Sequence, residues 1–309
     1  MSTPPATGAV VVPESFAALL RGRPAEGFQT GDAWLDRLPG LVRASLRRWE
    51  LTPDGPPRHG VCALVLPVRR HSGESAALKV AWPHPEARHE HLALQLWGGH
   101  GAVRLLAADP GTWTMLLERL DADRDLHDVP VDDACATIGD LLGRLDRPAT
   151  PQLTRLSGEV QRLLDALATP PPAIPRRFVE QAVALARDLV RDGQVDARLV
   201  HTDLHYANVL AGGREPWLAI DPKALAAEPA FAVAPALWNR WDEALAGHDV
   251  RGHLRRRLAI VCERGGIDEE RARAWTIVRE VQNALWATGG ADGAARVTTA
   301  VAIIKAMND

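Results

Sequence analysis

The sequence contains few cysteines, few lysines and no long apolar run. None of its three cysteines forms a C-x-x-C pair, which argues against a disulfide framework and against a zinc site. No apolar run approaches the length of a membrane span, and the first residues lack the basic segment that begins a signal peptide. The formal net charge of −3 gives no reason to expect nucleic-acid or anionic-membrane binding. These absences predict a cytoplasmic protein without either partner, and they leave its oligomeric state open.

Lysine is rare in a chain that is rich in arginine. Lysine accounts for three of the 36 lysine and arginine residues, namely Lys79, Lys223 and Lys305. Arginine serves for surface charge, whereas only lysine supplies a compact ammonium, so a lysine within an apolar strand is unlikely to be accidental. The longest basic run, Arg255 to Arg257, is interpreted as the solvated face of a helix.

The apolar pattern divides the chain into regions. Residues 1–12 are rich in proline, threonine, glycine and alanine, which predicts a loose tail. Residues 13–118 mix strand-like runs with helical patterns. The strand-like runs cover 61–68, 76–82, 103–107 and 112–118, and the helical patterns cover 31–49 and 86–97. Residues 119–309 are mostly helical, so the sequence predicts an α+β fold with a small antiparallel-sheet lobe followed by a larger helical lobe.

The strongest chemical signal is the run from His201 to Leu210, which contains Asp203 and, five residues later, Asn208. A short apolar run ending at Asp221 follows it. Phosphoryl transfer needs a carboxylate near the acceptor hydroxyl and hard oxygen ligands for Mg²⁺ on the ATP phosphates. This H-x-D-x-x-x-x-N pattern with a later strand-end Asp is typical of a protein-kinase-like catalytic loop. We interpret Asp203 as the catalytic base and Asn208 and Asp221 as Mg²⁺ ligands; ordinary turn residues are the alternative.

A second signal is Lys79, which lies within the apolar run at 76–82. Kinases place a lysine in such a strand to contact the α- and β-phosphates, and pair it with a glutamate of the next helix. That helix offers Glu86 and Glu90, one turn apart on the same face. Glu90 aligns with the apolar stripe and is preferred, while Glu86 stays open. The alternative for Lys79 is a charge that protects an edge strand.

The other nucleotide signals are thin. The full G-x-G-x-x-G pattern is absent, and Gly60 alone precedes the first predicted strand. The run ending in Glu118-Arg119-Leu120 fits a strand that leads into the connection between the lobes. There the backbone from Glu118 to Leu120 can hydrogen-bond adenine, although a buried strand entering a loop explains the run equally well.

With these motifs the sequence resembles the aminoglycoside phosphotransferases. Within that family it resembles the streptomycin 6-phosphotransferase and hydroxyurea kinase group. The resemblance extends over about residues 30–305 and is most specific at 203–210 and 215–223. It implies a protein-kinase-like two-lobe fold and an enzyme that uses ATP and Mg²⁺. It also implies transfer of the γ-phosphate to a hydroxyl of a small antibiotic-like molecule. Streptomycin is the expected substrate class, and hydroxyurea or another metabolite is the alternative.

Two positions depart from the family pattern. Ala232 stands where the family has an aspartate that braces the catalytic loop, and Asp146 stands where the family usually has histidine. The loss at Ala232 opens a second hypothesis, a nucleotide-binding regulatory module with little catalysis. The intact set of Asp203, Asn208, Asp221 and Lys79 opposes that hypothesis.

The acceptor site is less clearly marked. A cationic aminoglycoside needs carboxylates near the cleft, because ammonium and guanidinium groups pair best with them. The candidates lie in the C-terminal helices. They are Asp242, Glu243 and Glu280. Solvated helix charges are the alternative interpretation for each of them.

Overall fold

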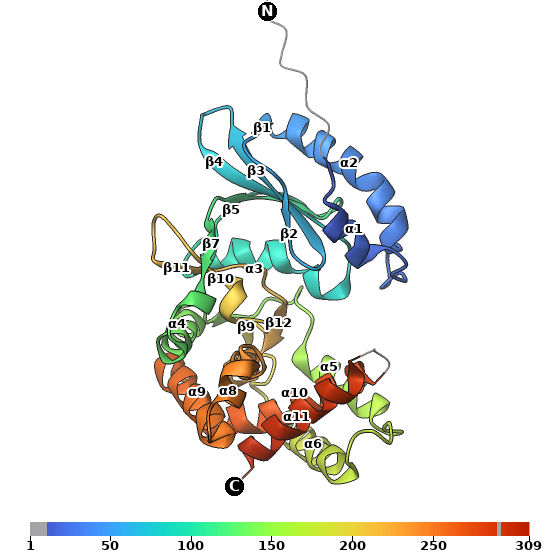
Figure 1. The fold of residues 1–309 in the computed structure, drawn as a ribbon, viewed down its shortest axis with the longest axis vertical. Coiled ribbons are helices and arrows are strands. Elements are labelled where there is room, and N and C mark those ends of the chain that lie inside the picture. The colour runs from blue at the N-terminus through green and yellow to red at the C-terminus, as the bar shows by residue number, and fades with distance from the viewer. Residues whose placement is uncertain (1–10, 289–291, 309) are drawn as a thin grey trace, which may run out of the picture. The chain divides into compact units, whose positions relative to one another are not determined.

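The computed structural model describes residues 11–288 and 292–308 (Figure 1). The chain divides into two compact units. The first comprises Met1–Gly99 and Val103–Leu120, and the second comprises His100–Ala102 and Asp121–Asp309. Most of the tail predicted for residues 1–12 lies outside the described residues.

The first unit is built on a six-stranded antiparallel sheet. Its strand order is β1-β3-β4-β6-β5, and β2 pairs with β3. The strands are β1 (Leu51–Pro53), β2 (Arg58–His59), β3 (Ala63–Arg70), β4 (Ser75–Ala81), β5 (Leu105–Asp109) and β6 (Thr114–Glu118). The four predicted strands are confirmed, each end within two residues of its prediction.

The helices α1 and α2 cover one face of this sheet, as Figure 1 shows. The helices of the first unit are α1 (Glu14–Leu20), α2 (Gly31–Arg48) and α3 (Glu90–Trp97), with a 3₁₀ turn η1 (Pro85–Ala87) before α3. Trp34, Leu38 and Val42 recur at helical spacing along α2 and are fully buried. They pack in one apolar core with alternate residues of β3 and β4, because successive side chains of a strand point to opposite faces.

The helix predicted at 86–97 is divided in the structure, so that prediction was wrong in its extent. A 3₁₀ turn begins at Pro85, and the α-helix begins only at Glu90. Short 3₁₀ turns are frequent at helix N-termini. The helix ends at Gly98, whose φ of 58° lies in the left-handed region that favours glycine. The division places Glu90 in the first turn of α3.

The second unit is mainly helical. Its helices are α4 (Val131–Arg144), α5 (Leu156–Ala166), α6 (Arg176–Leu189), α7 (Pro235–Trp238), α8 (Trp241–Ala246), α9 (Val250–Gly265), α10 (Glu269–Ala287) and α11 (Gly293–Met307). The helices α4 and α9 pack at close range at Gly139, where a Cβ would lie 2.7 Å from the Val261 carbonyl oxygen. No helix in the described part of the chain combines the length and the hydropathy needed to span a membrane.

Two small antiparallel sheets accompany these helices. One has the order β11-β10-β7 and the other β12-β9-β8. Their strands are β7 (Asp121–Asp125), β8 (Arg147–Pro148), β9 (Arg198–His201), β10 (Val209–Ala211), β11 (Trp217–Ala219) and β12 (Ala224–Ala227). The 3₁₀ turns are η2 (Leu126–Asp128), η3 (Tyr206–Asn208) and η4 (Pro229–Ala232). The hydropathy pattern missed β7, because its sequence DADRD has no apolar alternation and it is held by pairing with β10.

The interpretation of the basic run on α9 was wrong for one residue. Arg256 is exposed and pairs with Asp132, but the Arg257 side chain has no exposed surface. Its guanidinium donates to the carbonyl oxygens of Asn239 at 2.9 Å and Arg240 at 3.0 Å. A buried guanidinium needs such acceptors, so Arg257 supports the chain between α7 and α8 from within.

Candidate active site

The predicted catalytic loop leaves the end of β9 and is fixed there by β12. The two strands pair antiparallel, with Ala224 opposite His201. One position further along, the Thr202 backbone N–H and hydroxyl both donate to the Lys223 carbonyl oxygen, at 3.2 and 2.7 Å. The backbone immediately before Asp203 and the backbone of Lys223 are therefore held side by side.

His201 lies beneath the loop as a buried, neutral ring. Burial lowers the pKa of His201 to about 4, so the imidazole carries one proton at neutral pH. Its Nε2 lies 3.0 Å from the Ile220 carbonyl oxygen, and its Nδ1 lies 3.2 Å from the Asp203 backbone nitrogen. A proton on Nε2 satisfies both contacts, since Nε2 then donates to Ile220 and Nδ1 accepts from Asp203. His201 thereby positions the start of the loop and joins it to the segment before Asp221.

The Asp203 carboxylate is partly buried and lies beside a cation. Its Oδ2 is 3.0 Å from the Lys223 ammonium and 4.0 Å from Nε2 of His205. Desolvation lowers the pKa of His205, which favours its neutral form. The sequence interpretation had assigned no role to Lys223. The rarity of lysine in this arginine-rich chain was the signal that could have pointed to Lys223.

Asn208 and Asp221 are brought together by the hairpin of β10 and β11. Beyond the ladder the Ile220 N–H donates to the Asn208 carbonyl oxygen at 2.9 Å, and Asp221 is the next residue. Asp221 is exposed, and its φ of 54° is a left-handed conformation that aspartate tolerates better than most residues. The buried Asn208 donates its amide N–H to the Asp203 carbonyl oxygen at 2.8 Å, which leaves the amide oxygen for a ligand.

The donor set fits Mg²⁺ better than a metal that needs a complete protein cage. Within residues 11–288 and 292–308 no group of three or more His, Cys, Asp or Glu side chains is arranged to hold a metal ion. Asn208 and Asp221 offer one amide oxygen and one carboxylate. Magnesium usually takes one or two carboxylates together with water and substrate phosphates.

Tyr206 supports the loop from below, a role that the sequence interpretation missed. Its hydroxyl is buried, donates to the Ala236 carbonyl oxygen at 2.9 Å and lies 3.3 Å from the Cys135 sulfur. The Arg240 guanidinium lies over the ring, 5.0 Å from its centroid. Tyr206 therefore connects the loop to α4 and α7. Tyrosine occurs once in the chain, which is the only signal the sequence offers.

In the first unit Lys79 and Glu90 form a buried ion pair. Lys79 is opposite Met115 in the ladder of β4 and β6, and its ammonium lies 2.6 Å from Oε1 of Glu90. The side chains are 8% and 3% exposed. Glu86, the alternative partner, precedes α3 in the 3₁₀ turn and its side chain is exposed.

The other predicted nucleotide contacts lie at separate places in the first unit. Glu118 ends β6, and its carboxylate accepts the Arg104 backbone N–H at 2.8 Å. Leu120 is two residues further on. Gly60 follows β2, and a Cβ there would meet no atom within 4 Å. Packing does not require a glycine at position 60.

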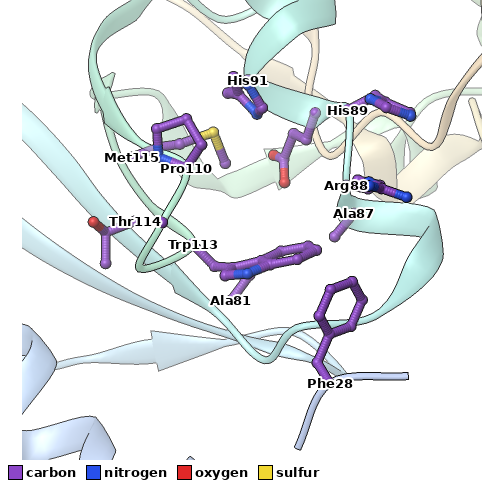
Figure 2. A pocket seen from close by; sticks show the side chains of 12 residues that line it. Phe28, Ala81, Ala87, Arg88, His89, His91, Pro110, Trp113, Thr114 and Met115 are labelled. Atoms are coloured by element: carbon purple, nitrogen blue, oxygen red, sulfur yellow. The ribbon is translucent and has the colours of Figure 1, made fainter. Parts of the chain in front are cut away.

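A cavity of about 400 Å³ in the first unit borders the ion pair on the side of Glu90 (Figure 2). The Trp113 ring faces it next to Phe28, and the two rings lie edge to face with centroids 5.0 Å apart. His89 and His91 line it from the start of α3. Burial lowers the pKa of both histidines, so both favour the neutral form. Glu90 is the one predicted nucleotide residue that this cavity reaches.

The acidic candidates for the acceptor differ in setting. Asp242 and Glu243 are exposed on α8. Glu243 is bound by both ends of the Arg240 guanidinium, at 2.5 and 2.8 Å, and this contact lowers its pKa. Glu280 is 2% exposed within α10, and desolvation raises its pKa to about 8. Only Glu243 among the three is already paired with an arginine at both carboxylate oxygens.

Comparison with known proteins decides the family. The profile described as aminoglycoside/hydroxyurea antibiotic resistance kinase matches residues 48–290. The chain belongs to this family of kinases. A streptomycin 6-kinase from Streptomyces glaucescens is 45% identical over 287 residues, covering 90% of this chain and 91% of the relative. A hydroxyurea phosphotransferase from Kitasatospora aureofaciens is 43% identical over 288 residues, covering 90% of this chain and 81% of the relative.

Solved structures share the fold of this resistance kinase at low sequence identity. The amicoumacin kinase hAmiN, in complex with AMP-PNP, Ca²⁺ and Ami, gives a TM-score of 0.57 at 14% identity, over 89% of this chain and 95% of that one. The aminoglycoside phosphotransferase APH(4)-Ia, in a ternary complex with ADP and hygromycin B, gives 0.56 at 15% identity, over 85% and 97%. These matches confirm the predicted protein-kinase-like α+β fold.

The two departures from the kinase family pattern have different settings. Ala232 is fully buried in η4, and the loop is held instead by the bonds of His201, Thr202 and Tyr206 described above. Asp146 accepts both arms of the Arg198 guanidinium, at 2.5 and 2.7 Å. Because Arg198 begins β9, this carboxylate supports the strand that carries the catalytic loop.

Proposed function

We propose that this kinase transfers the γ-phosphate of ATP to a hydroxyl of an aminoglycoside, with streptomycin as the acceptor. The observation that carries the proposal is the loop cluster in which Asn208 donates to the Asp203 carbonyl oxygen and Ile220, the residue before Asp221, donates to the Asn208 carbonyl oxygen. The 45% identity to a streptomycin 6-kinase supports the choice of acceptor.

Each residue has a distinct part in the proposed reaction. Asp203 orients the acceptor hydroxyl and takes its proton. Asn208 and Asp221 hold Mg²⁺, which when bound neutralises charge on the phosphates. Lys79, held by Glu90, contacts the α- and β-phosphates. The backbone from Glu118 to Leu120 and the segment at Gly60 complete the nucleotide contacts; these two assignments stay predictions.

Acidic side chains are proposed to bind the acceptor. Asp242, Glu243 and Glu280 are the carboxylates proposed for a cationic acceptor, since guanidinium and ammonium groups bind best to carboxylates. Arg240 competes for Glu243, so a substrate cation has to share or displace that pair. Asp242 faces no such competition from Arg240. Glu280 is 2% exposed and its raised pKa favours the neutral form, so a substrate cation gains least from it.

The test uses the full-length chain with ATP, MgCl₂ and streptomycin. We expect ADP release, and we expect streptomycin to gain the mass of one HPO₃ unit. Samples without acceptor and samples with EDTA serve as controls. Binding of ATP without transfer to any acceptor would instead support the regulatory module that Ala232 suggested.

Hydroxyurea is the second acceptor, because a hydroxyurea phosphotransferase matches the chain at 43% identity. The same assay with hydroxyurea alone decides between the two. Transfer to hydroxyurea and none to streptomycin would overturn the aminoglycoside assignment while leaving the phosphotransferase assignment intact.

A further inference from the structure

Lys223 occupies a position at which its ammonium meets the proposed catalytic carboxylate. Nζ lies 3.0 Å from Oδ2 of Asp203. The backbone beneath this contact is fixed in two ways. The Lys223 carbonyl oxygen accepts two hydrogen bonds from Thr202, and the next residue, Ala224, begins β12. The side chain is 36% exposed, so the ammonium is not placed there by general burial. A specific local role explains the contact better than packing does.

The choice of lysine is informative in this chain. Arginine outnumbers lysine 33 to 3, yet a lysine stands beside Asp203. Two arginines of the second unit take both oxygens of a partly buried carboxylate, Arg198 with Asp146 and Arg271 with Glu228, although Glu215 receives one oxygen contact each from Arg144 and Arg214. A planar guanidinium forms such two-point contacts, whereas an ammonium acts as a single charged point.

We propose that Lys223 is a positioning residue that holds Asp203 by one oxygen and leaves the other for the acceptor hydroxyl. The inference rests on the proposed function, in which Asp203 receives the hydroxyl proton. As the acceptor oxygen bonds to the γ-phosphorus, its proton passes to the unpaired oxygen of Asp203. The bond from the γ-phosphorus to the bridging oxygen breaks, and its electron pair leaves with ADP.

Holding the carboxylate matters more here than making it basic. Phosphoryl transfer proceeds through a loose transition state in most analyses, so positioning the nucleophile carries much of the catalysis. An ion pair restricts the rotation of the Asp203 carboxylate and fixes which oxygen faces the acceptor. An arginine at position 223 that bound Asp203 as Arg198 binds Asp146 would occupy both oxygens and exclude the hydroxyl.

The experiment compares three substitutions of Lys223 with streptomycin and ATP as substrates. Lys223→Met should lower kcat about tenfold to a hundredfold, the range found when a hydrogen-bonding partner that orients a metal-binding side chain is removed, with little change in KM for ATP. Lys223→Arg should lose a comparable factor although it keeps the charge. Lys223→Cys treated with 2-bromoethylamine regains an ammonium at nearly the original distance and should recover most of kcat. The same Cys variant treated with iodoacetamide stays neutral and should not recover.

Lys305→Met is the matched control, since Lys305 is exposed near the end of α11. It should leave kcat and KM unchanged. Full activity of Lys223→Arg would overturn the one-oxygen argument, and full activity of Lys223→Met would remove Lys223 from the reaction altogether. A wild-type enzyme that phosphorylates neither streptomycin nor hydroxyurea would refute the proposed function instead.

A second measurement tests the ion pair without activity. With three lysines in the chain, ¹³C-labelled lysine gives three side-chain signals that single substitutions assign. Asp203→Asn should move the Cε signal of Lys223 and leave that of Lys305 in place. An unmoved Lys223 signal would show that the two side chains do not pair in solution.

Discussion

Two lysine–carboxylate pairs in this chain have the same charges and different surroundings. Lys79 joins a central strand to the first turn of α3, and its ammonium lies 2.6 Å from Glu90 with side chains 8% and 3% exposed. Lys223 joins the start of β12 to the catalytic loop, 3.0 Å from Asp203, with side chains 36% and 17% exposed. One pair is desolvated within regular structure, and the other is solvated between loops.

The different surroundings of the two pairs predict different effects of substitution on stability and on turnover. Removing one member of a buried pair leaves an uncompensated charge in the interior, which is strongly destabilising. A partly exposed pair adds little to stability, because water competes with each partner. The first pair is therefore expected to respond to substitution mainly by unfolding, and the second mainly by losing turnover.

The largest effect should come from Asp203→Asn. Loss of the proposed base should lower kcat about 10²- to 10⁴-fold, the range found for general acid–base groups. The free energy of unfolding should change little, because the side chain is partly exposed and its backbone bonds persist. Single-turnover kinetics and a urea titration on the same sample measure the two effects. Wild-type turnover in this variant would show that the Asp203 carboxylate is not needed for the reaction.

Local patterns predicted the parts of the fold and site that depend on neighbouring residues. The spacing of Asp203 and Asn208, with Asp221 two residues after β11, is set by one loop and one hairpin, so the sequence shows it directly. Lys79 was visible because an ammonium within an apolar strand is unusual. The preference for Glu90 came from helical spacing, and the structure pairs it with Lys79.

Contacts between distant residues were not predictable in the same way. The strand β7 is polar and exists through its pairing with β10, 84 positions away or more. Arg257 looked solvated, because the acceptors that permit its burial lie on the chain between α7 and α8. Tyr206 carries no motif, and its partners lie on α4 and α7. In each case the deciding interaction lies far away in sequence.

Lys79→Met tests the buried pair. Removing the ammonium that pairs with the buried Glu90 carboxylate should lower the free energy of unfolding by about 3–5 kcal/mol. The double variant Lys79→Met/Glu90→Leu removes both charges and should recover most of that loss, while turnover stays low because the proposed phosphate contact is gone. Urea unfolding and kcat of both variants provide the measurement. Equal stability of the single and double variants would show that the pair is not desolvated in solution.

Glu280→Gln tests a buried carboxyl group that lies in a different setting from Glu90. Glu280 and Glu90 are each 2% exposed, but Oε1 of Glu280 accepts no hydrogen bond among the described residues. Desolvation raises the pKa of Glu280 to about 8, opposed by Asn283 and Arg279. Between about pH 4.5 and 8 the unfolded chain releases a proton that the folded chain keeps. Stability from this group is therefore lost as the pH rises through that window.

The Gln variant cannot titrate, so its stability should fall less between pH 5 and pH 8, by on the order of 3 kcal/mol. Urea unfolding at both pH values gives the difference. Glu270→Gln is the control, because Glu270 is exposed on the same helix. If both variants follow the wild-type pH dependence, Glu280 is ionised in the folded protein and has a cationic partner as Glu90 does.

The smallest effect is expected for Tyr206→Phe. This substitution tests whether the Lys223–Asp203 pair depends on the buried Tyr206 hydroxyl below the loop. The substitution removes a hydroxyl that donates to the Ala236 carbonyl oxygen and contacts the Cys135 sulfur. A buried hydrogen bond of this kind contributes about 1 kcal/mol, and the aromatic ring under Arg240 is retained.

We expect the free energy of unfolding to fall by about 1–2 kcal/mol, since the Ala236 carbonyl loses its buried donor. The decrease in kcat should be smaller than that of Lys223→Met, because His201 and Thr202 still hold the backbone beside Asp203. Urea unfolding and kcat again provide the readout, with Cys135→Ala as the control for the sulfur contact. A decrease in kcat as large as that of Lys223→Met, at unchanged stability, would mean that the orientation of Asp203 is set from beneath the loop rather than by the ammonium beside it.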